Sequence, residues 1–437
     1  MERAEVYPMF SVEHKYGAFV DREELMMIKK IKEYVDREVL PRRLELEGGW
    51  HRDEKLAEET LDLVYKGLVE LGVQRLLIPT KYGGIRMSPP GIMALKEEVA
   101  RGDPGLSNHM SVIHWVVSVI RAARRDDLMQ MIAEKLTSDE PWTACVAITE
   151  PIGGANIEDP MQEFRTIRTI AELDGDEYVI NGHKIWPPGG PKNVFERKNL
   201  KGNLGYIVLA TTDPNKGRDG VCLFYVPPDA KGLEFSKPFE KMGMCFTDRN
   251  VEIWFNNVRV PKEYCIVGPG GEAADIVEGY LIAAGRLATA AFAVGAAQAA
   301  LEIAVEWTKA REIAGKPMRE RSLFAGIIGE MFKRVEASRM YYLSVAQMTR
   351  YREIYGPMWS KEMVARCSAA RSFAADNALW VISKAIELMG SYGYVFENKV
   401  ERYYRDTKIL QLWLGGPGRD RLDIAYGLYG PFKWASG

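Results

Sequence analysis

Apolar residues recur every three or four positions through most of the first 140 residues. One such face is formed by Leu25, Ile28, Ile31 and Val35, and another runs through residues 57–71. This spacing is typical of amphipathic helices with one face buried in a core. Prolines at positions 41, 79, 89, 90 and 104 separate the periodic stretches. The pattern therefore predicts a helical N-terminal domain over residues 1–140 with short connections.

The pattern changes over residues 141–260. Short β-branched and aromatic runs alternate with turn residues, and the dipeptide Asn181-Gly182 indicates a hairpin turn. This alternation predicts a central β-domain, an antiparallel sandwich or barrel. The runs lie at residues 166–171, 178–180, 205–210, 221–226 and 251–255.

After Pro261 the apolar spacing becomes helical again. The stretches 273–309, 322–355 and 361–388 are too long for strands, so residues 261–437 are predicted to form a C-terminal helical domain. Helices, strands and helices follow one another without alternation, which favours an α+β fold over a doubly wound sheet. The sequence has no GxGxxG motif and no P-loop, so any bound nucleotide must be held by another device.

Composition narrows the function. The chain has 437 residues, 47% of them hydrophobic, and a net charge of -2, so bulk charge does not indicate a nucleic acid or membrane partner. Five cysteines without a CxxC pair and an N-terminus without signal-peptide features indicate a cytoplasmic protein. The apolar tract 280–305 contains Arg286 and Glu302, which favours a buried helix over a membrane span. Small-molecule chemistry is therefore the expectation.

Four motifs in fixed order carry a resemblance to a known family. They are Ala-Ile-Thr-Glu-Pro-Ile-Gly-Gly-Ala from residue 147, Asn-Gly-His-Lys-Ile-Trp from 181, Arg-Glu-Ile-Ala-Gly-Lys-Pro from 311 and Arg-Asp-Thr-Lys-Ile from 405. The chain resembles the acyl-CoA dehydrogenase family from about residue 25 to 425. The resemblance implies a helical N-terminal domain, a central antiparallel β-domain and a C-terminal four-helix bundle. It also implies FAD, an acyl-CoA substrate, an electron-transfer partner for an oxidative reaction, and a homotetramer or dimer.

The resemblance also implies roles for particular residues. Thr149 would hydrogen-bond the pyrimidine side of FAD, and the Trp186 indole would pack against the flavin ring. Arg311 would grip the FAD pyrophosphate across a subunit boundary. Arg286 would lie close to the CoA-binding channel, with a purely structural ion pair as the alternative. Pro188 stands where the family has Ser or Thr, so the surroundings of flavin N5 are expected to differ.

The usual catalytic base is missing. Counting forward from the Arg-Asp-Thr-Lys-Ile motif places Leu414 at the family's Glu position, and Gly285 occupies the place where some relatives carry that Glu. His114 is the candidate replacement, because imidazole transfers protons near neutral pH. Trp115 beside it is the candidate substrate contact. A hydrogen-bonded core histidine is the alternative for His114, and no Ser-His-Asp motif or metal cluster competes.

Three functions stay open at this stage. The first is FAD-dependent dehydrogenation of an unusual or cyclic acyl-CoA with a relocated base. The second is a lyase, decarboxylase or hydratase on the same fold without net oxidation. The third is a non-catalytic subunit of a hetero-oligomer.

Overall fold

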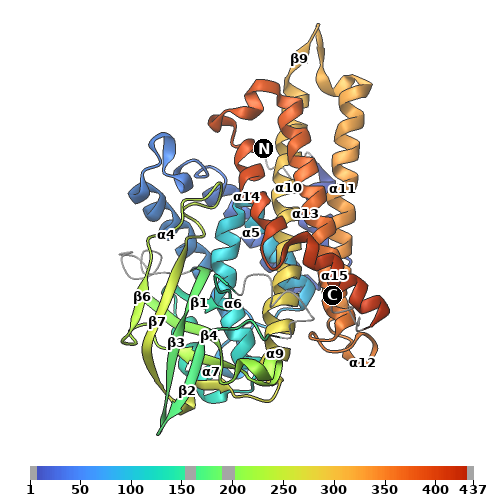
Figure 1. The fold of residues 1–437 in the computed structure, drawn as a ribbon. Helices are drawn as coiled ribbons and strands as arrows, with labels where there is room; N and C mark the ends of the chain where they lie inside the picture. The colour runs from blue at the N-terminus through green and yellow to red at the C-terminus, as the bar shows by residue number, and fades with distance from the viewer. Residues whose placement is uncertain (1–6, 153–163, 189–201, 431–437) are drawn as a thin grey trace.

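The computed structural model describes residues 7–152, 164–188 and 202–430, and its elements follow the predicted order of helices, strands and helices (Figure 1). The N-terminal helices start at side-chain caps. Asp21 caps the helix that follows it in a capping box with Glu24, and Asp103 accepts from the Leu106 N–H at 2.9 Å. These helices are α2 (Val12–Tyr16), α3 (Arg22–Tyr34), α4 (Glu54–Glu70), α5 (Pro89–Gly102), α6 (Pro104–Ala122) and α7 (Asp126–Leu136).

Helices α5 and α6 form the middle of the molecule. Both begin with proline at the first helical position, which suits its fixed φ, and nearly every residue of both is buried. Helix α6 packs against strand β1 (Trp142–Ala147), while α5 packs against α10 (Ala284–Ala310) of the C-terminal domain (Figure 1). The two helices therefore join the sheet to the bundle.

The central domain is one eight-stranded sheet. Its order is β6-β7-β3-β2-β4-β5-β8, and β1 joins β4 off this path. The pairings are antiparallel except for β1 with β4 and β2 with β4, which are parallel. The remaining strands are β2 (Ile170–Asp174), β3 (Glu177–Pro188), β4 (Gly202–Thr211), β5 (Val221–Val226), β6 (Leu233–Phe235), β7 (Asn250–Pro261) and β8 (Cys265–Val267).

The turn predicted at Asn181-Gly182 is wrong. These residues lie inside β3, at a register shift against β7, and the Asn181 side chain bonds to Asn257 on the neighbouring strand at 3.2 Å. The hairpin turns earlier, around Gly175 with φ 65°. An Asn-Gly dipeptide also suits a β-bulge, and here it lies at the bulge in the pairing of β3 with β7.

The C-terminal domain is built from long antiparallel helices (Figure 1). The predicted stretch 273–309 forms α9 (Glu272–Ile276), a π-helical segment η10 (Val277–Ala283) and α10. A short hairpin, β9 (Glu312–Ile313) and β10 (Lys316–Pro317), leads to the remaining helices. These are α11 (Ser322–Met348), α12 (Arg352–Tyr355), α13 (Lys361–Met389), α14 (Val400–Leu412) and α15 (Gly416–Tyr429).

The stretch Glu272–Ala310 is long and apolar enough to cross a membrane. However, 89% of its most apolar window is buried by the rest of the molecule, as in a core helix. This burial agrees with the predicted buried helix.

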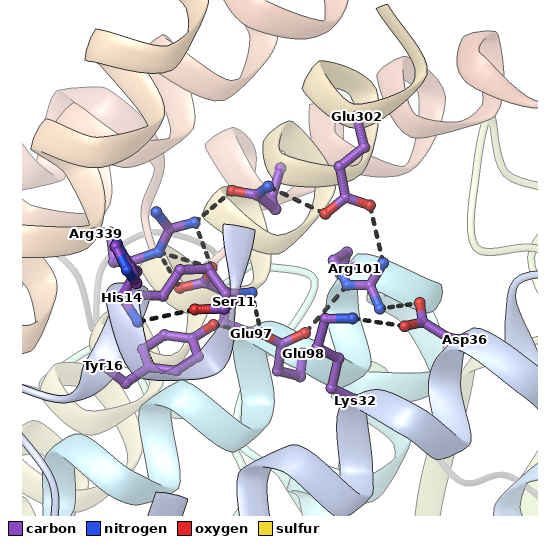
Figure 2. Close-up of polar contacts among 12 residues, drawn as sticks. Ser11, His14, Tyr16, Lys32, Asp36, Glu97, Glu98, Arg101, Glu302 and Arg339 are labelled. Atoms are coloured by element: carbon purple, nitrogen blue, oxygen red, sulfur yellow. Dashed lines mark hydrogen bonds and ion pairs between the residues drawn. The ribbon is translucent and has the colours of Figure 1, made fainter. Parts of the chain in front are cut away.

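A buried charge network ties the N-terminal helices to the bundle (Figure 2). Glu98 on α5 accepts from Lys15, from the Tyr16 hydroxyl at 2.9 Å and from Arg101 at 3.1 Å. Arg101 also bonds Glu302 of α10 at 3.0 Å. The neighbouring Glu97 pairs with Arg339 of α11 at 2.8 Å. The network fixes the position of α5 between the two halves of the molecule.

Candidate active site

A cleft of about 430 Å³ lies where the sheet meets the helices. Its walls come from the ends of β1 and β3, from α6, from η10 and from the loop between α14 and α15. The lining is mostly apolar, with a few polar side chains, as in sites that bind a small molecule or cofactor.

The sheet side of the cleft carries Thr149 and Trp186, two of the predicted flavin residues. The Thr149 carbonyl accepts from the Ile185 N–H at 2.9 Å, which aligns the segment after β1 with β3. Trp186 has φ 71° and its side chain is 48% exposed, and its ring lies 4.5 Å from that of Phe239. Pro188 lines the same wall. The sequence prediction thus located residues that share one cleft, and their cofactor roles stay predictions.

Glu150 holds this wall in place, a role that the sequence did not reveal. Its buried carboxylate accepts from the backbone N–H groups of Arg168 and Thr169 at 2.7 and 2.9 Å, and from Lys184 Nζ at 2.8 Å. Burial alone would raise the pKa of Glu150. The charge and the hydrogen bond of Lys184, together with a hydrogen bond from Thr169, lower this pKa overall. The carboxylate stays ionised and anchors the residue next to Thr149.

The opposite wall is the loop from Trp413 to Gly416. Leu414, Gly415 and Gly416 all have positive φ, at 51°, 99° and 66°, and glycine is the residue that adopts this region at little cost. Two buried arginines hold the loop carbonyls: Arg371 donates to Trp413 O at 2.6 Å, and Arg286 donates to Leu414 O at 2.8 Å. The loop conformation is therefore fixed by buried arginines that bond its backbone carbonyls.

Arg286, predicted to lie close to the CoA-binding channel, is bonded to protein groups in the structure. Its side chain is 0% exposed and does not line the cleft. Its guanidinium bonds Asp423, Ser368 at 2.9 Å and the Leu414 carbonyl, and lies 3.4 Å from Asp420. A buried arginine needs such partners, and here they are all protein groups. These contacts favour the alternative of a structural ion pair that positions the Leu414 loop, and the predicted role near the CoA channel stays untested.

Leu414, which the sequence predicts at the place of the missing base, lies in the cleft, and that assignment stays a prediction. The Leu414 side chain lies 3.1 Å from the position that a Cβ on residue 285 would occupy. The same point on Gly285 is 3.4 Å from the Trp115 ring. Leu414, Gly285 and Trp115 thus meet at one place, and none of the three accepts a proton. Trp115 lines the cleft, as expected of a substrate contact, and that role stays a prediction.

Asp248 is the only carboxylate among the described residues that line the cleft. It is 3% exposed, accepts from Asn108 Nδ2 at 2.9 Å and lies 3.5 Å from Lys241 Nζ. Lys241 is also held by Asn250 Oδ1 at 2.6 Å. Sequence reasoning missed Asp248. The signal was present, since the polar run from residue 247 to 250 directly precedes a strand with a buried face.

His114 lies outside this cleft. It lines a neighbouring cavity, is 1% exposed, and its Nε2 bonds the Val73 carbonyl at 2.8 Å. Burial, together with the charge of Lys96, lowers the pKa of His114 to about 3, so an ionisation near neutral pH is not expected of it. The predicted proton-transfer role stays untested, and its position favours the alternative of a core histidine.

Arg311, predicted to hold FAD across a subunit boundary, is exposed at the start of the β9–β10 hairpin. The hairpin projects from the end of the molecule opposite the sheet (Figure 1). Arg311 does not line the cleft. This position leaves Arg311 accessible to another chain, and the predicted role stays a prediction.

Comparison with known proteins identifies relatives over nearly the whole chain. Three family models match in order: "Acyl-CoA dehydrogenase, N-terminal domain" over residues 21–140, the middle domain over 145–258 and the C-terminal domain over 277–429. Cyclohex-1-ene-1-carbonyl-CoA dehydrogenase of Geobacter metallireducens is 30% identical over 396 residues, which is 90% of this chain and 94% of the relative. 3-(Aryl)acrylate reductase of Clostridium sporogenes is 26% identical and covers 94% and 99%. The structure of butyryl-CoA dehydrogenase from Megasphaera elsdenii superposes with a TM-score of 0.77 at 25% identity, covering 94% and 98%.

Proposed function

The chain belongs to the acyl-CoA dehydrogenase family, and from this premise we propose that it is a FAD-dependent oxidoreductase that acts on a CoA thioester. The thioester carries a cyclic or otherwise unusual acyl group, and Asp248 transfers the proton. The relative from Geobacter, named for a cyclohexene-carbonyl thioester, supports the cyclic acyl group. The observation that carries the proposal is the cleft itself, where the predicted flavin residues face a wall without the usual base and Asp248 is the one carboxylate of the described lining.

The residues present fit a flavin. The Trp186 indole offers a flat, half-exposed aromatic face, Thr149 offers a hydroxyl, and the walls between them are apolar. Asn108 Oδ1 is buried and has no hydrogen-bond partner among the described residues, so it can accept from a ligand. When bound, FAD supplies the two-electron redox chemistry.

The surroundings of Asp248 suit proton transfer. Asn108 fixes the carboxylate by one hydrogen bond, and Lys241 balances its charge from 3.5 Å, so the second oxygen is held without being tightly paired. Ile282 and Trp413 keep the rest of the cleft apolar, which excludes water and strengthens the electrostatic effect of each charge. Asp248 can accept a ring C–H proton of a cyclic acyl group in oxidation, or return it in reduction. The proton leaves from a ring carbon other than the α carbon, because the α carbon of a thioester such as cyclohex-1-ene-1-carbonyl-CoA carries no hydrogen.

Two variants separate Asp248 from His114. With cyclohex-1-ene-1-carbonyl-CoA and a panel of other thioesters, Asp248→Asn should slow flavin reduction by roughly 10²–10⁴-fold while FAD content and thioester affinity persist. His114→Gln should keep the rate per flavin-loaded molecule. The same assay run backwards, from reduced flavin and an unsaturated thioester, gives the direction, which matters because one relative is named a reductase. If flavin reduction stays fast in Asp248→Asn and becomes slow in His114→Gln, the proton is transferred by His114 and not by Asp248.

We also propose that the protein is cytoplasmic and forms a homo-oligomer, either a tetramer or a dimer. It passes electrons to a separate electron-transfer partner. Arg311 is exposed, as a residue that contacts a neighbouring subunit would have to be in a single chain.

A further inference from the structure

A second cavity, of about 590 Å³, borders the cleft at Trp115, which lines both. One face of α5 and one face of α6 form its walls, and the residues around the start of α10 close it. Its mouth is lined by exposed charged side chains, whereas its inner end is buried and mostly apolar. None of the roles derived for the flavin cleft uses this space.

The inner end contains two polar groups without partners. Lys96 of α5 is 3% exposed, and its ammonium has no hydrogen bond or ion pair with any described residue. His114 of α6 donates through Nε2, and its Nδ1 is buried without a partner. Burial lowers the pKa of Lys96 to about 7. An unpaired ammonium in an apolar environment is costly, so the position is explained best by a ligand that brings a negative charge.

The mouth has a surplus of positive charge. Arg121, Arg124 and Arg352 face Glu272 and Asp275 across it. Asp275 is already paired with Arg218 at 2.7 Å, outside the cavity lining. An anion is therefore attracted into the cavity rather than repelled from it.

The cavity is adjacent to the reaction cleft. Trp115 lines both, and on the helix that forms the third wall Ile282 faces the cleft while Ala284 faces the cavity. Gly285 of α10 places no side chain against the Trp115 ring, since a Cβ at that position would lie 3.4 Å from it. The Trp115 indole is thus a wall common to the two spaces, so a group that extends from the cleft past Trp115 would enter the cavity whose lining includes Lys96.

We infer that this cavity binds a carboxylate at the distal end of the acyl group, so that the substrate is the CoA thioester of a dicarboxylic acid, with Lys96 as the residue that selects it. The inference rests on the proposed function, because it takes the ligand to be the acyl chain of the thioester in the cleft. The carboxylate gives Lys96 its missing acceptors. Its negative charge also favours a proton on His114 Nδ1, which then becomes a second donor.

The test compares matched ligands on the flavin-loaded protein. Straight-chain acyl-CoAs of increasing length are each paired with the analogue that carries a terminal carboxylate, and their dissociation constants are measured by calorimetry. At one or more chain lengths the carboxylate analogue should bind roughly 10–100-fold more tightly, the range expected for a hydrogen bond to a charged group. Lys96→Met should remove that preference without weakening the plain thioester. Arg121→Gln, at the exposed mouth, should keep it.

Lys96→Met removes an unpaired buried charge, so it should fold at least as well as the native chain, and a melting curve checks this. A pH series adds a second readout. Binding of the carboxylate analogue should weaken as pH rises above about 7 and Lys96 loses its proton. The other charged or titratable groups in the cavity lining are His114, Tyr280, Arg121, Arg124, Glu272, Asp275 and Arg352, and the exposed arginines keep their charge in this range.

Two results would overturn the inference: equal affinity for both members of every pair, or an unchanged preference in Lys96→Met. If no thioester of either kind binds or alters the flavin spectrum, the proposed function fails instead. The two failures are thus distinguishable.

Discussion

Leu414 changes the chemistry of the cleft at the scale of a single side chain. Its backbone carbonyl is held by Arg286 and its φ is positive, so the loop conformation does not depend on what the side chain carries. The side chain points toward Gly285, into the cleft. The position of Leu414 was predicted from a family motif alone, because its loop follows the Arg-Asp-Thr-Lys-Ile motif at residues 405–409 and the count from that motif needs no gap. Asp248 could not be located in this way, since it reaches the cleft from the sheet domain through the fold.

The first prediction concerns Leu414 itself. Butyryl-CoA or octanoyl-CoA mixed anaerobically with the native protein should leave the flavin oxidised, because no base stands at the usual position for the α proton and Asp248 is proposed to serve a ring proton instead. Leu414→Glu should allow bleaching by these thioesters, since the new carboxylate would project toward Gly285, which itself carries no side chain. Stopped-flow absorbance measures the rate.

Leu414→Gln is the matched control, because it has the same shape and no basic carboxylate. A bleaching rate equal in both variants would show that polarity rather than proton acceptance limits the reaction. Rapid bleaching of the native protein by either thioester would contradict the prediction outright.

At the scale of elements, apolar periodicity predicted what local spacing can determine. The long helices α10, α11 and α13 lie where the pattern placed them, because each has a buried face that repeats every three or four residues. The Asn181-Gly182 turn failed because the dipeptide suits a bulge as well as a turn, and only the pairing of β3 with β7 decides between them. Likewise a buried arginine in α10 predicts a partner but not which one, since Asp423 comes from α15.

The network around α5 gives a prediction about pH. Burial would raise the pKa of Glu98, but the charges of Lys15 and Arg101 lower it to about 2. A carboxyl group with a folded-state pKa below its unfolded value of about 4.5 adds stability above that value, and the contribution is lost as the pH falls toward 2. Glu98→Gln should lower the free energy of unfolding at neutral pH by roughly 3–5 kcal/mol, the usual cost of breaking a buried pair.

Denaturant unfolding at a series of pH values measures both effects. Between about pH 4.5 and 2 the native protein should lose stability more steeply than Glu98→Gln, because the variant lacks one group that takes up a proton on unfolding. Glu172→Gln, an exposed change on β2, serves as the control and should follow the native curve. Parallel curves for native protein and Glu98→Gln would show that Glu98 is not the group that titrates.

At the scale of the whole molecule, the order of three domains was predictable, but the contacts among them were not. Lys96 is an ordinary polar position in the periodicity of α5, and it becomes a buried, unpartnered cation only because α6 and the start of α10 enclose it. The same packing of α5, α6 and the start of α10 places His114 in the second cavity rather than in the cleft. Chemistry that depends on surfaces brought together by packing has no signature in the local sequence.

The last prediction concerns a residue whose proposed ligand is on another chain. The Arg311 guanidinium is exposed and has no partner among the described residues of its own chain, so within one subunit it contributes little to stability. If it grips the FAD pyrophosphate of a neighbour, Arg311→Gln should weaken FAD retention by roughly 10–100-fold, the loss expected when a charged hydrogen bond is removed. Absorbance after dialysis measures bound flavin, and light scattering measures the assembly. Lys316→Gln removes another exposed charge from the same hairpin and should retain FAD. Full flavin content in an intact Arg311→Gln oligomer would mean that the pyrophosphate is held within one chain, and the hairpin would then have no part in cofactor binding.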